Sequence, residues 1–119
     1  DFSEVKGDVT QISAISAGDM NIPAREILPL WRDRIGAAIT GEHWLDFTAA
    51  GKDKGLHLLC AHFGIPQENT YAFGDSYNDA PMLRVAAHPY LMSIAPADLK
   101  AEFSTQIDDV VGVLKTLGY

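Results

Sequence analysis

The sequence has little that would crosslink the chain or carry it through a membrane. It contains one cysteine, Cys60, in 119 residues, so an internal disulfide is excluded and a reducing cytoplasm is the expected compartment. No apolar run approaches the roughly 20 residues that span a bilayer. Basic residues are also few: nine Lys and Arg against 16 Asp and Glu give a net charge of −7. This balance argues against a nucleic-acid partner, but a local cation would still allow a small phosphorylated substrate.

Residues 1–50 have the pattern of a small α/β unit. A strand is predicted over residues 9–15, a helix from Asn21 with that residue as its cap, and two further strands over 37–40 and 44–48. Pro29 falls inside the helical pattern, where it removes a hydrogen bond, so the helix is expected to start late or to bend there.

Residues 51–119 alternate between helical patterns and short apolar strands. Helices are predicted over 54–63, from Asp79, over 96–103 and from Ile107 to Leu117, and strands over 70–73 and 89–94. Strands that alternate with helices predict an α/β fold, in which a parallel sheet is covered by helices on both faces.

The segment 71–83 carries the most chemical information. An apolar strand ends at Gly74, where the missing Cβ lets the backbone turn sharply. Asp75 and Asp79 follow at a spacing of four, with Asn78 beside the second, and a helix then begins. Ligands of parallel α/β sheets bind beyond the carboxyl ends of the strands. Two carboxylates there, with no lysine or arginine between them, favour a hard cation such as Mg²⁺.

Residues 74–79, Gly-Asp-Ser-Tyr-Asn-Asp, resemble the fourth motif of the haloacid dehalogenase-type phosphatases, Gly-Asp-x-x-Asn-Asp. Upstream, Lys54 and Gly55 at the start of a helix are similar to the third motif of that superfamily. The variety is similar to the Cof-type branch, subclass IIB, in which a large cap precedes the lysine of the third motif. The resemblance implies the C-terminal part of a Rossmann-like core over residues 51–119 and the end of an α+β cap over residues 1–50.

The resemblance also implies a role for each site residue. Asp75 would bind Mg²⁺ directly, and Asp79 would support the metal through water. Asn78 would orient the phosphate or the lysine, and Lys54 would pair with the transferring phosphoryl group and the nucleophilic carboxylate. The implied activity is hydrolysis of small phosphate monoesters, such as sugar phosphates, through an aspartyl-phosphate intermediate.

One element of that family is absent from the sequence. The nucleophile is the first aspartate of an Asp-x-Asp motif, and no aspartate here is followed by another two positions on. The chain is therefore expected to be the second half of such an enzyme and to be inactive by itself. Truncation, cleavage and a naturally short protein all remain open as origins, and so do a hydrolase, a phosphotransferase and a mutase as the parent.

A non-catalytic module is the alternative interpretation. An open parallel sheet that lacks its central strands exposes unpaired backbone edges. Such an edge favours association with a second copy or with the missing N-terminal segment.

Several residues also have plain structural interpretations. Lys52 is expected on the surface, although it could face the pocket, and Cys60, on the apolar stripe of its helix, is expected in the core. The four histidines show no metal-ligand spacing and are interpreted as structural or exposed. Taken alone, an Asp-x-x-Asn-Asp segment is most often a polar helix cap.

Overall fold

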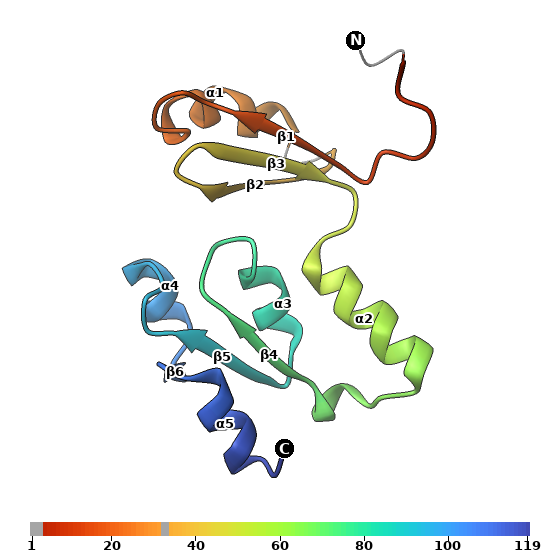
Figure 1. Ribbon diagram of the computed structural model, residues 1–119, viewed down its shortest axis with the longest axis vertical. Helices are drawn as coiled ribbons and strands as arrows, with labels where there is room; N and C mark the ends of the chain where they lie inside the picture. The colour runs from red at the N-terminus through yellow and green to blue at the C-terminus, as the bar shows by residue number, and fades with distance from the viewer. Residues whose placement is uncertain (1–3, 32–33) are drawn as a thin grey trace. The chain divides into compact units, whose positions relative to one another are not determined.

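The computed structural model describes residues 4–31 and 34–119. The chain forms two compact units, Asp1–Ala50 and Gly51–Tyr119 (Figure 1). Within the described residues, no helix has the length and apolar character needed to cross a membrane.

The first unit is an antiparallel sheet with one helix packed on it. The sheet has the order β1-β3-β2, and its core is formed by Met20, Ala24 and Leu45. The elements are β1 (Gln11–Ile15), α1 (Asn21–Trp31), β2 (Gly36–Gly41) and β3 (Trp44–Thr48).

The start of α1 differs from the sequence prediction. Asn21 is the first helical residue, and the carboxylate of Asp19 accepts a hydrogen bond from the Asn21 backbone N–H at 2.9 Å. Asp19 therefore occupies the acceptor role that was predicted for Asn21. The helix does not start late, because it begins at Asn21 and continues through Pro29 to Trp31.

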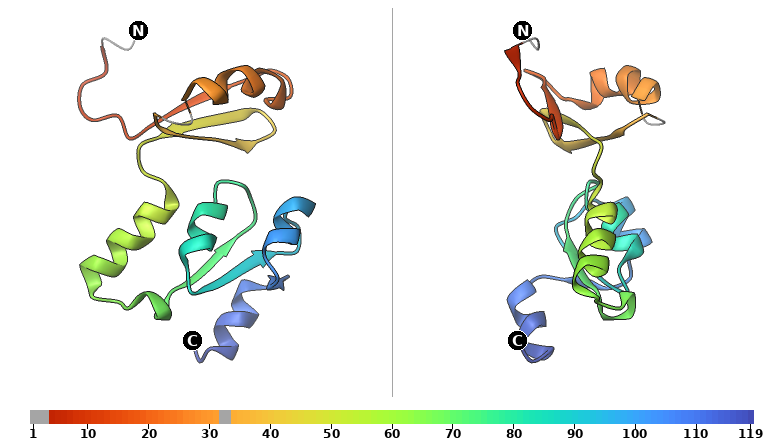
Figure 2. Two further views of the ribbon diagram at one scale, coloured as in Figure 1. Left: turned by 180° about the vertical axis from the view of Figure 1, so that it is seen from behind. Right: turned by 90° about the vertical axis from the view of Figure 1, so that its right-hand side faces the viewer.

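The second unit is a parallel sheet flanked by helices, with the strand order β4-β5-β6. In the right-hand view of Figure 2, α3 and α4 lie on one side of this sheet and α5 on the other. The elements are α2 (Lys52–Phe63), a 3-10 turn (Gln67–Asn69), β4 (Tyr71–Gly74), α3 (Ala80–Val85), β5 (His88–Met92), α4 (Ala97–Glu102), β6 (Gln106–Ile107) and α5 (Val110–Thr116).

The two faces of the parallel sheet carry different side chains. Ala72 and Leu91 are buried in a cluster with residues of α3 and α4, including Leu83 and Leu99. The neighbouring positions along β4 and β5 carry rings that stack across the strands, and Tyr71 lies 4.4 Å from His88 between ring centroids. This alternation is the period of two expected for strands.

Three sequence predictions for this unit are wrong in detail. Ile107 belongs to the short strand β6, and the last helix begins at Val110, with the carboxylate of Asp109 accepting a hydrogen bond from Val111 N–H at 2.9 Å. Helix α2 begins at Lys52 instead of Lys54. Cys60, predicted in the core, is half-buried and lines an open cavity. None of the side chains of α2 is fully buried.

Candidate functional site

The candidate site forms where β4 ends and the chain turns into α3. Gly74 is the last residue of β4 and is buried. A Cβ built on Gly74 would lie 2.5 Å from the Cβ of Asp79, which is closer than side chains approach. Glycine at this position therefore lets the loop fold back onto the strand end and bring Asp79 against it.

The carboxylate of Asp79 holds this loop together from the inside. The residue is only 5% exposed. Its Oδ2 atom accepts hydrogen bonds from the backbone N–H groups of Asp75, at 3.0 Å, and Ser76, at 3.2 Å. Its Oδ1 atom accepts a hydrogen bond from the ammonium group of Lys52 and forms an ion pair with it. Both oxygens are therefore engaged by groups of the protein.

The protonation of Asp79 follows from these contacts. Burial opposes ionisation of the carboxyl group, but the hydrogen bond from Lys52 and the two backbone N–H groups outweigh it. The pKa of Asp79 is accordingly held below its usual value. Asp79 is thus a fixed negative charge at neutral pH, and it organises the loop around itself.

Lys52, which the sequence interpretation placed on the surface, contacts the motif through its ammonium group. Its side chain is 48% exposed, yet its ammonium group is fixed on Asp79 from the first turn of α2. Lys54 lies two positions further along, roughly 200° around the helix axis, so the two side chains leave α2 on opposite sides. The ion pair therefore places the ammonium group of Lys52 beside the loop.

Asp75 presents its carboxylate differently from Asp79. It is exposed, directly after the C-terminal end of β4, and its side chain makes no hydrogen bond or ion pair with another described residue. Asn78 is half-buried in the same loop. A free carboxylate at the end of a parallel strand, beside a lysine, is suited to an oxygen-ligated cation and a phosphate.

The donor set fits Mg²⁺ better than a metal that requires a protein cage. Among residues 4–31 and 34–119, no group of three or more His, Cys, Asp or Glu side chains converges as metal ligands. Mg²⁺ commonly takes one or two carboxylates and completes its octahedron with water and phosphate oxygens. Asp75 would hold the ion directly. Asp79, with both oxygens engaged, would act on it indirectly.

A further contact, which the sequence did not suggest, ties the loop to α4. The Tyr77 hydroxyl lies 3.0 Å and 3.1 Å from the two carboxylate oxygens of Asp98, to which it donates its hydrogen. This hydrogen bond raises the pKa of Tyr77. Tyrosine and aspartate are 21 positions apart, so only the fold brings them together.

Replacing Gly74 with alanine is expected to destabilise the second unit by about 1–3 kcal/mol, because the new methyl group would have to displace Asp79. Urea unfolding measures the effect. Gly55→Ala is the matched control: a Cβ there meets nothing within 4 Å, and alanine inside α2 should stabilise by about 0.5–1 kcal/mol. Equal stability of Gly74→Ala and the parent chain would contradict this close approach.

Comparison with known proteins shows the family to which the chain belongs. Residues 8–117 match the family model of the haloacid dehalogenase-like hydrolases. The chain belongs to this family, in the Cof-type, subclass IIB branch.

Two curated relatives are phosphatases. The chain is 34% identical over 84 residues to 5-amino-6-(5-phospho-D-ribitylamino)uracil phosphatase YwtE of Bacillus subtilis, covering 67% of the chain and 29% of that protein. It is 40% identical over 60 residues to phosphoglycolate phosphatase of Methanopyrus kandleri, covering 50% of the chain and 24% of that protein. The chain thus matches less than a third of the length of either relative.

Solved structures show the same fold. The subclass IIB sugar phosphatase BT4131 superposes with a TM-score of 0.76 at 30% identity, over 94% of this chain and 44% of that one. SMU.1108c of Streptococcus mutans superposes with a TM-score of 0.80 at 22% identity, over 98% of this chain and 47% of that one. Both units of the chain are therefore arrangements found in this superfamily.

Proposed function

We propose that this chain supplies the cation- and phosphate-binding half of a Mg²⁺-dependent phosphatase that hydrolyses small phosphate monoesters, sugar phosphates or similar. The observation that carries the proposal is the ion pair of Lys52 with Asp79 beside the exposed carboxylate of Asp75. The sequence contains no Asp-x-Asp segment to supply the aspartyl nucleophile. By itself the chain is therefore inactive, and the activity belongs to a protein that also contains that segment.

Each residue of the proposed site acts through a contact or position already described. Asp75 holds the cation, which when bound neutralises charge on the phosphoryl group. Lys52 brings a second positive charge to the same place and is kept there by Asp79. Asn78, the remaining polar residue of the loop, orients the phosphate or the lysine. Asp79 fixes the loop backbone through the N–H groups of Asp75 and Ser76, so that these charges are preorganised.

Lys52 takes the role that the sequence interpretation gave to Lys54. Both lysines lie in the first turn of α2, but Lys52 is the one whose ammonium group contacts the loop residue Asp79. The role of Lys54 in phosphoryl transfer stays a prediction from the motif, and it makes Lys54 the natural comparison in mutagenesis.

The two units have different roles in this proposal. Residues 51–119 form the C-terminal part of the catalytic core, and residues 1–50 form the end of a cap that shapes the substrate pocket. The named substrates of the two relatives, a phosphorylated ribityl compound and phosphoglycolate, support a small phosphorylated metabolite as the substrate class. Such metabolites are cytoplasmic, so the cytoplasm is the proposed location.

Phosphate release is the direct test of the proposed function. The protein that joins this chain to an Asp-x-Asp segment is assayed against sugar phosphates, phosphoglycolate and an aryl phosphate, with Mg²⁺ and with EDTA. The proposal expects phosphate from at least one substrate with Mg²⁺ and none with EDTA. If a folded protein released no phosphate from any substrate of the panel with Mg²⁺ present, the proposal would be overturned.

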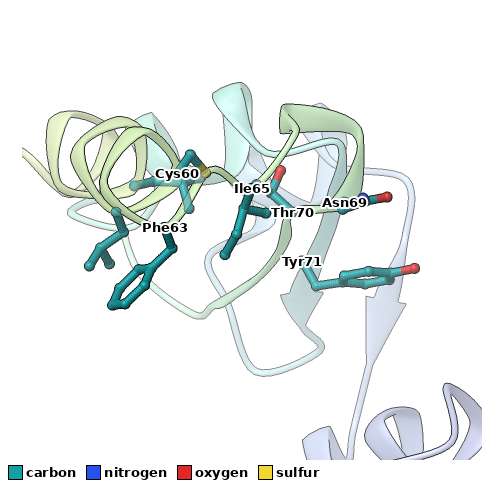
Figure 3. Close-up of a pocket in the computed structure, with 8 residues that line it drawn as sticks. Cys60, Phe63, Ile65, Asn69, Thr70 and Tyr71 are labelled. Carbon is teal, nitrogen blue, oxygen red and sulfur yellow. The ribbon is translucent and has the colours of Figure 1, made fainter.

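Association is a second candidate function, and an open apolar cavity favours it. The cavity, of about 350 Å³, lies between α2 and the start of β4. Figure 3 shows Phe63, Ile65 and Tyr71 among its lining side chains. Phe63 is 66% exposed, and β4 pairs only with β5 in the part of the chain that the structure describes. A strand with one unpaired edge, beside exposed apolar side chains, favours pairing with another strand.

The 119-residue chain is accordingly expected to form dimers or larger species, detected by light scattering over a range of concentrations. Phe63→Lys should shift the chain toward monomer, because it places a charge in the cavity. Leu58→Lys is the matched control, since Leu58 is 71% exposed on the same helix but does not line the cavity. A monomer at every concentration would exclude self-association through this face.

A further inference from the structure

The loop between β4 and α3 is attached to the rest of its unit on two sides. On the inner side, the Asp79 carboxylate accepts hydrogen bonds from the backbone N–H groups of Asp75 and Ser76. The middle of the loop, Tyr77 and Asn78, makes no hydrogen bond with that carboxylate. Among the described residues, the Tyr77 hydroxyl makes the one side-chain hydrogen bond of this middle part. Tyr77 therefore attaches the outer side of the loop.

The acceptor of that hydrogen bond lies on a helix that is itself anchored to α3. Asp98 is in the first turn of α4, and its neighbour Leu99 is buried in the cluster that also contains Leu83 of α3. Four positions after Asp98, on the same helix face, Glu102 accepts hydrogen bonds from Arg84 Nε at 2.6 Å and Nη2 at 2.9 Å. A bidentate pair of this kind fixes orientation. One face of α4 therefore binds the loop at one end and α3 at the other.

The contact between Tyr77 and Asp98 has the geometry of a tether. The hydroxyl oxygen lies 3.0 Å and 3.1 Å from the two carboxylate oxygens, and a hydrogen bond to an ionised acceptor is stronger than one between neutral groups. A tyrosine side chain has two rotatable torsions, so holding it in one conformation costs little entropy. The ring is 46% exposed and lies outside the buried cluster, so the hydroxyl contact fixes its position.

The place of this tether in the loop distinguishes it from an ordinary surface hydrogen bond. Tyr77 lies two positions after Asp75 and one before Asn78, the two residues that would face the cation and the phosphate. The side chains of both make no hydrogen bond or ion pair with another described residue. Their placement therefore depends on the backbone that carries them, and a rotation of the loop at Tyr77 would move both.

We infer that Tyr77 is a positioning residue of the cation site, and that it acts through its hydrogen bond to Asp98 without touching the cation or the phosphate. The inference rests on the proposed function, because it gives Tyr77 the task of placing Asp75 and Asn78. Loss of an outer-shell partner of a metal ligand commonly weakens metal binding by roughly tenfold to a hundredfold. Tyr77 is joined to Asp75 only through the backbone, so an effect at the lower end, about tenfold, is expected.

The test is a Mg²⁺ titration of the ¹⁵N-labelled 119-residue chain and its variants, followed by the amide resonances of residues 74–79, with urea unfolding of each protein. Tyr77→Phe and Asp98→Ala should each raise the Kd for Mg²⁺ by about tenfold, and the double variant should raise it no further. Asp98→Asn should restore most of the affinity, because its amide oxygen still accepts the hydroxyl proton.

Tyr71→Phe is the matched control for Tyr77→Phe. Tyr71 lies on β4, in the same unit, and its hydroxyl makes no hydrogen bond with another described residue. Removal of this hydroxyl should leave the Kd for Mg²⁺ unchanged. The comparison of Asp98→Asn with Asp98→Ala is a second control, because both variants lose the negative charge and only one loses the acceptor.

Two results would overturn the inference and leave the cation site in place. One is an unchanged Kd in Tyr77→Phe, even with a lower urea midpoint, because the contact would then serve stability alone. The other is a weakened Kd in Tyr77→Phe with normal binding in Asp98→Ala, because Tyr77 would then act without Asp98. A loop that does not respond to Mg²⁺ in the parent chain would instead overturn the proposed cation site, and the inference with it.

Discussion

Asp75→Asn is expected to lower Mg²⁺-dependent phosphate release by at least about a hundredfold. In the proposed site this carboxylate is the direct ligand of the cation, and an amide oxygen is neutral and binds Mg²⁺ weakly. The substitution should not disturb the fold, because the side chain is exposed and contacts no other described residue through a hydrogen bond or ion pair. The rate is measured in the protein that contains both halves, over a range of Mg²⁺ concentrations.

Glu68→Gln provides the matched control for Asp75→Asn. It removes one negative charge from an exposed position in the same unit, in the 3-10 turn before β4. Its rate and its Mg²⁺ dependence should equal those of the parent protein. If Asp75→Asn instead kept both the rate and the Mg²⁺ requirement, the cation would have to bind elsewhere and the proposed role of Asp75 would be wrong.

Lys52→Ala is expected to lower phosphate release by roughly a hundredfold to a thousandfold, whereas Lys54→Ala should change it less than about threefold. Lys52 holds its charge beside the loop through Asp79, and Lys54 leaves α2 on the opposite side. The two variants remove the same charge from the same helical turn. They differ in which side of α2 loses its cation, and Lys52→Ala also removes the ion pair with Asp79.

The outcome of this pair also separates two assignments of the third motif. A large loss in Lys54→Ala with a normal rate in Lys52→Ala would restore the sequence assignment and contradict the structural one. Lys52→Arg tests whether the shape of the side chain matters as well as its charge. The charge is retained, so the ion pair with Asp79 should persist. The larger guanidinium group should nevertheless raise KM or lower kcat.

The loop from Gly74 to Asp79 was predictable because its chemistry is contiguous in the sequence. A strand, a glycine, two carboxylates and a helix start follow one another within ten residues, so local rules suffice. The parallel arrangement of the second unit was also predictable, because helices alternate with short apolar strands. The haloacid dehalogenase-like family and the α/β fold inferred on this basis are confirmed.

The partner of Asp79 was harder to predict because it depends on where α2 begins. Asp53 resembles a helix cap, which starts the helix at Lys54, but the helix starts at Lys52 with Gly51 in the cap position. Two residues along an α-helix correspond to a rotation of more than half a turn around its axis. A start at Lys52 instead of Lys54 therefore changes which lysine is expected to face the loop. One feature of the sequence points to Lys52. It lies four positions before Leu56, so the two share a helix face, and Leu56 packs against the buried cluster.

Other features are invisible in sequence because they join distant segments. The hydrogen bond from Ser13 Oγ to the Asp46 carboxylate joins residues 33 positions apart on β1 and β3, and the register of these strands sets it. The contact of Tyr77 with Asp98 depends in the same way on the packing of α4. The strand β6 has two residues, too few for a periodic pattern, and so Ile107 was assigned to the following helix.

The most direct test of the central claim is a Mg²⁺ titration of the ¹⁵N-labelled chain, in which the backbone amides of residues 74–79 are followed. The account predicts saturable shifts confined to this loop and the first turn of α2, which Asp75→Asn abolishes and Glu68→Gln preserves. Addition of inorganic phosphate in the presence of Mg²⁺ should then shift the Lys52 resonances, and not without the ion. An unresponsive loop, or the same shifts in Asp75→Asn, would contradict the account.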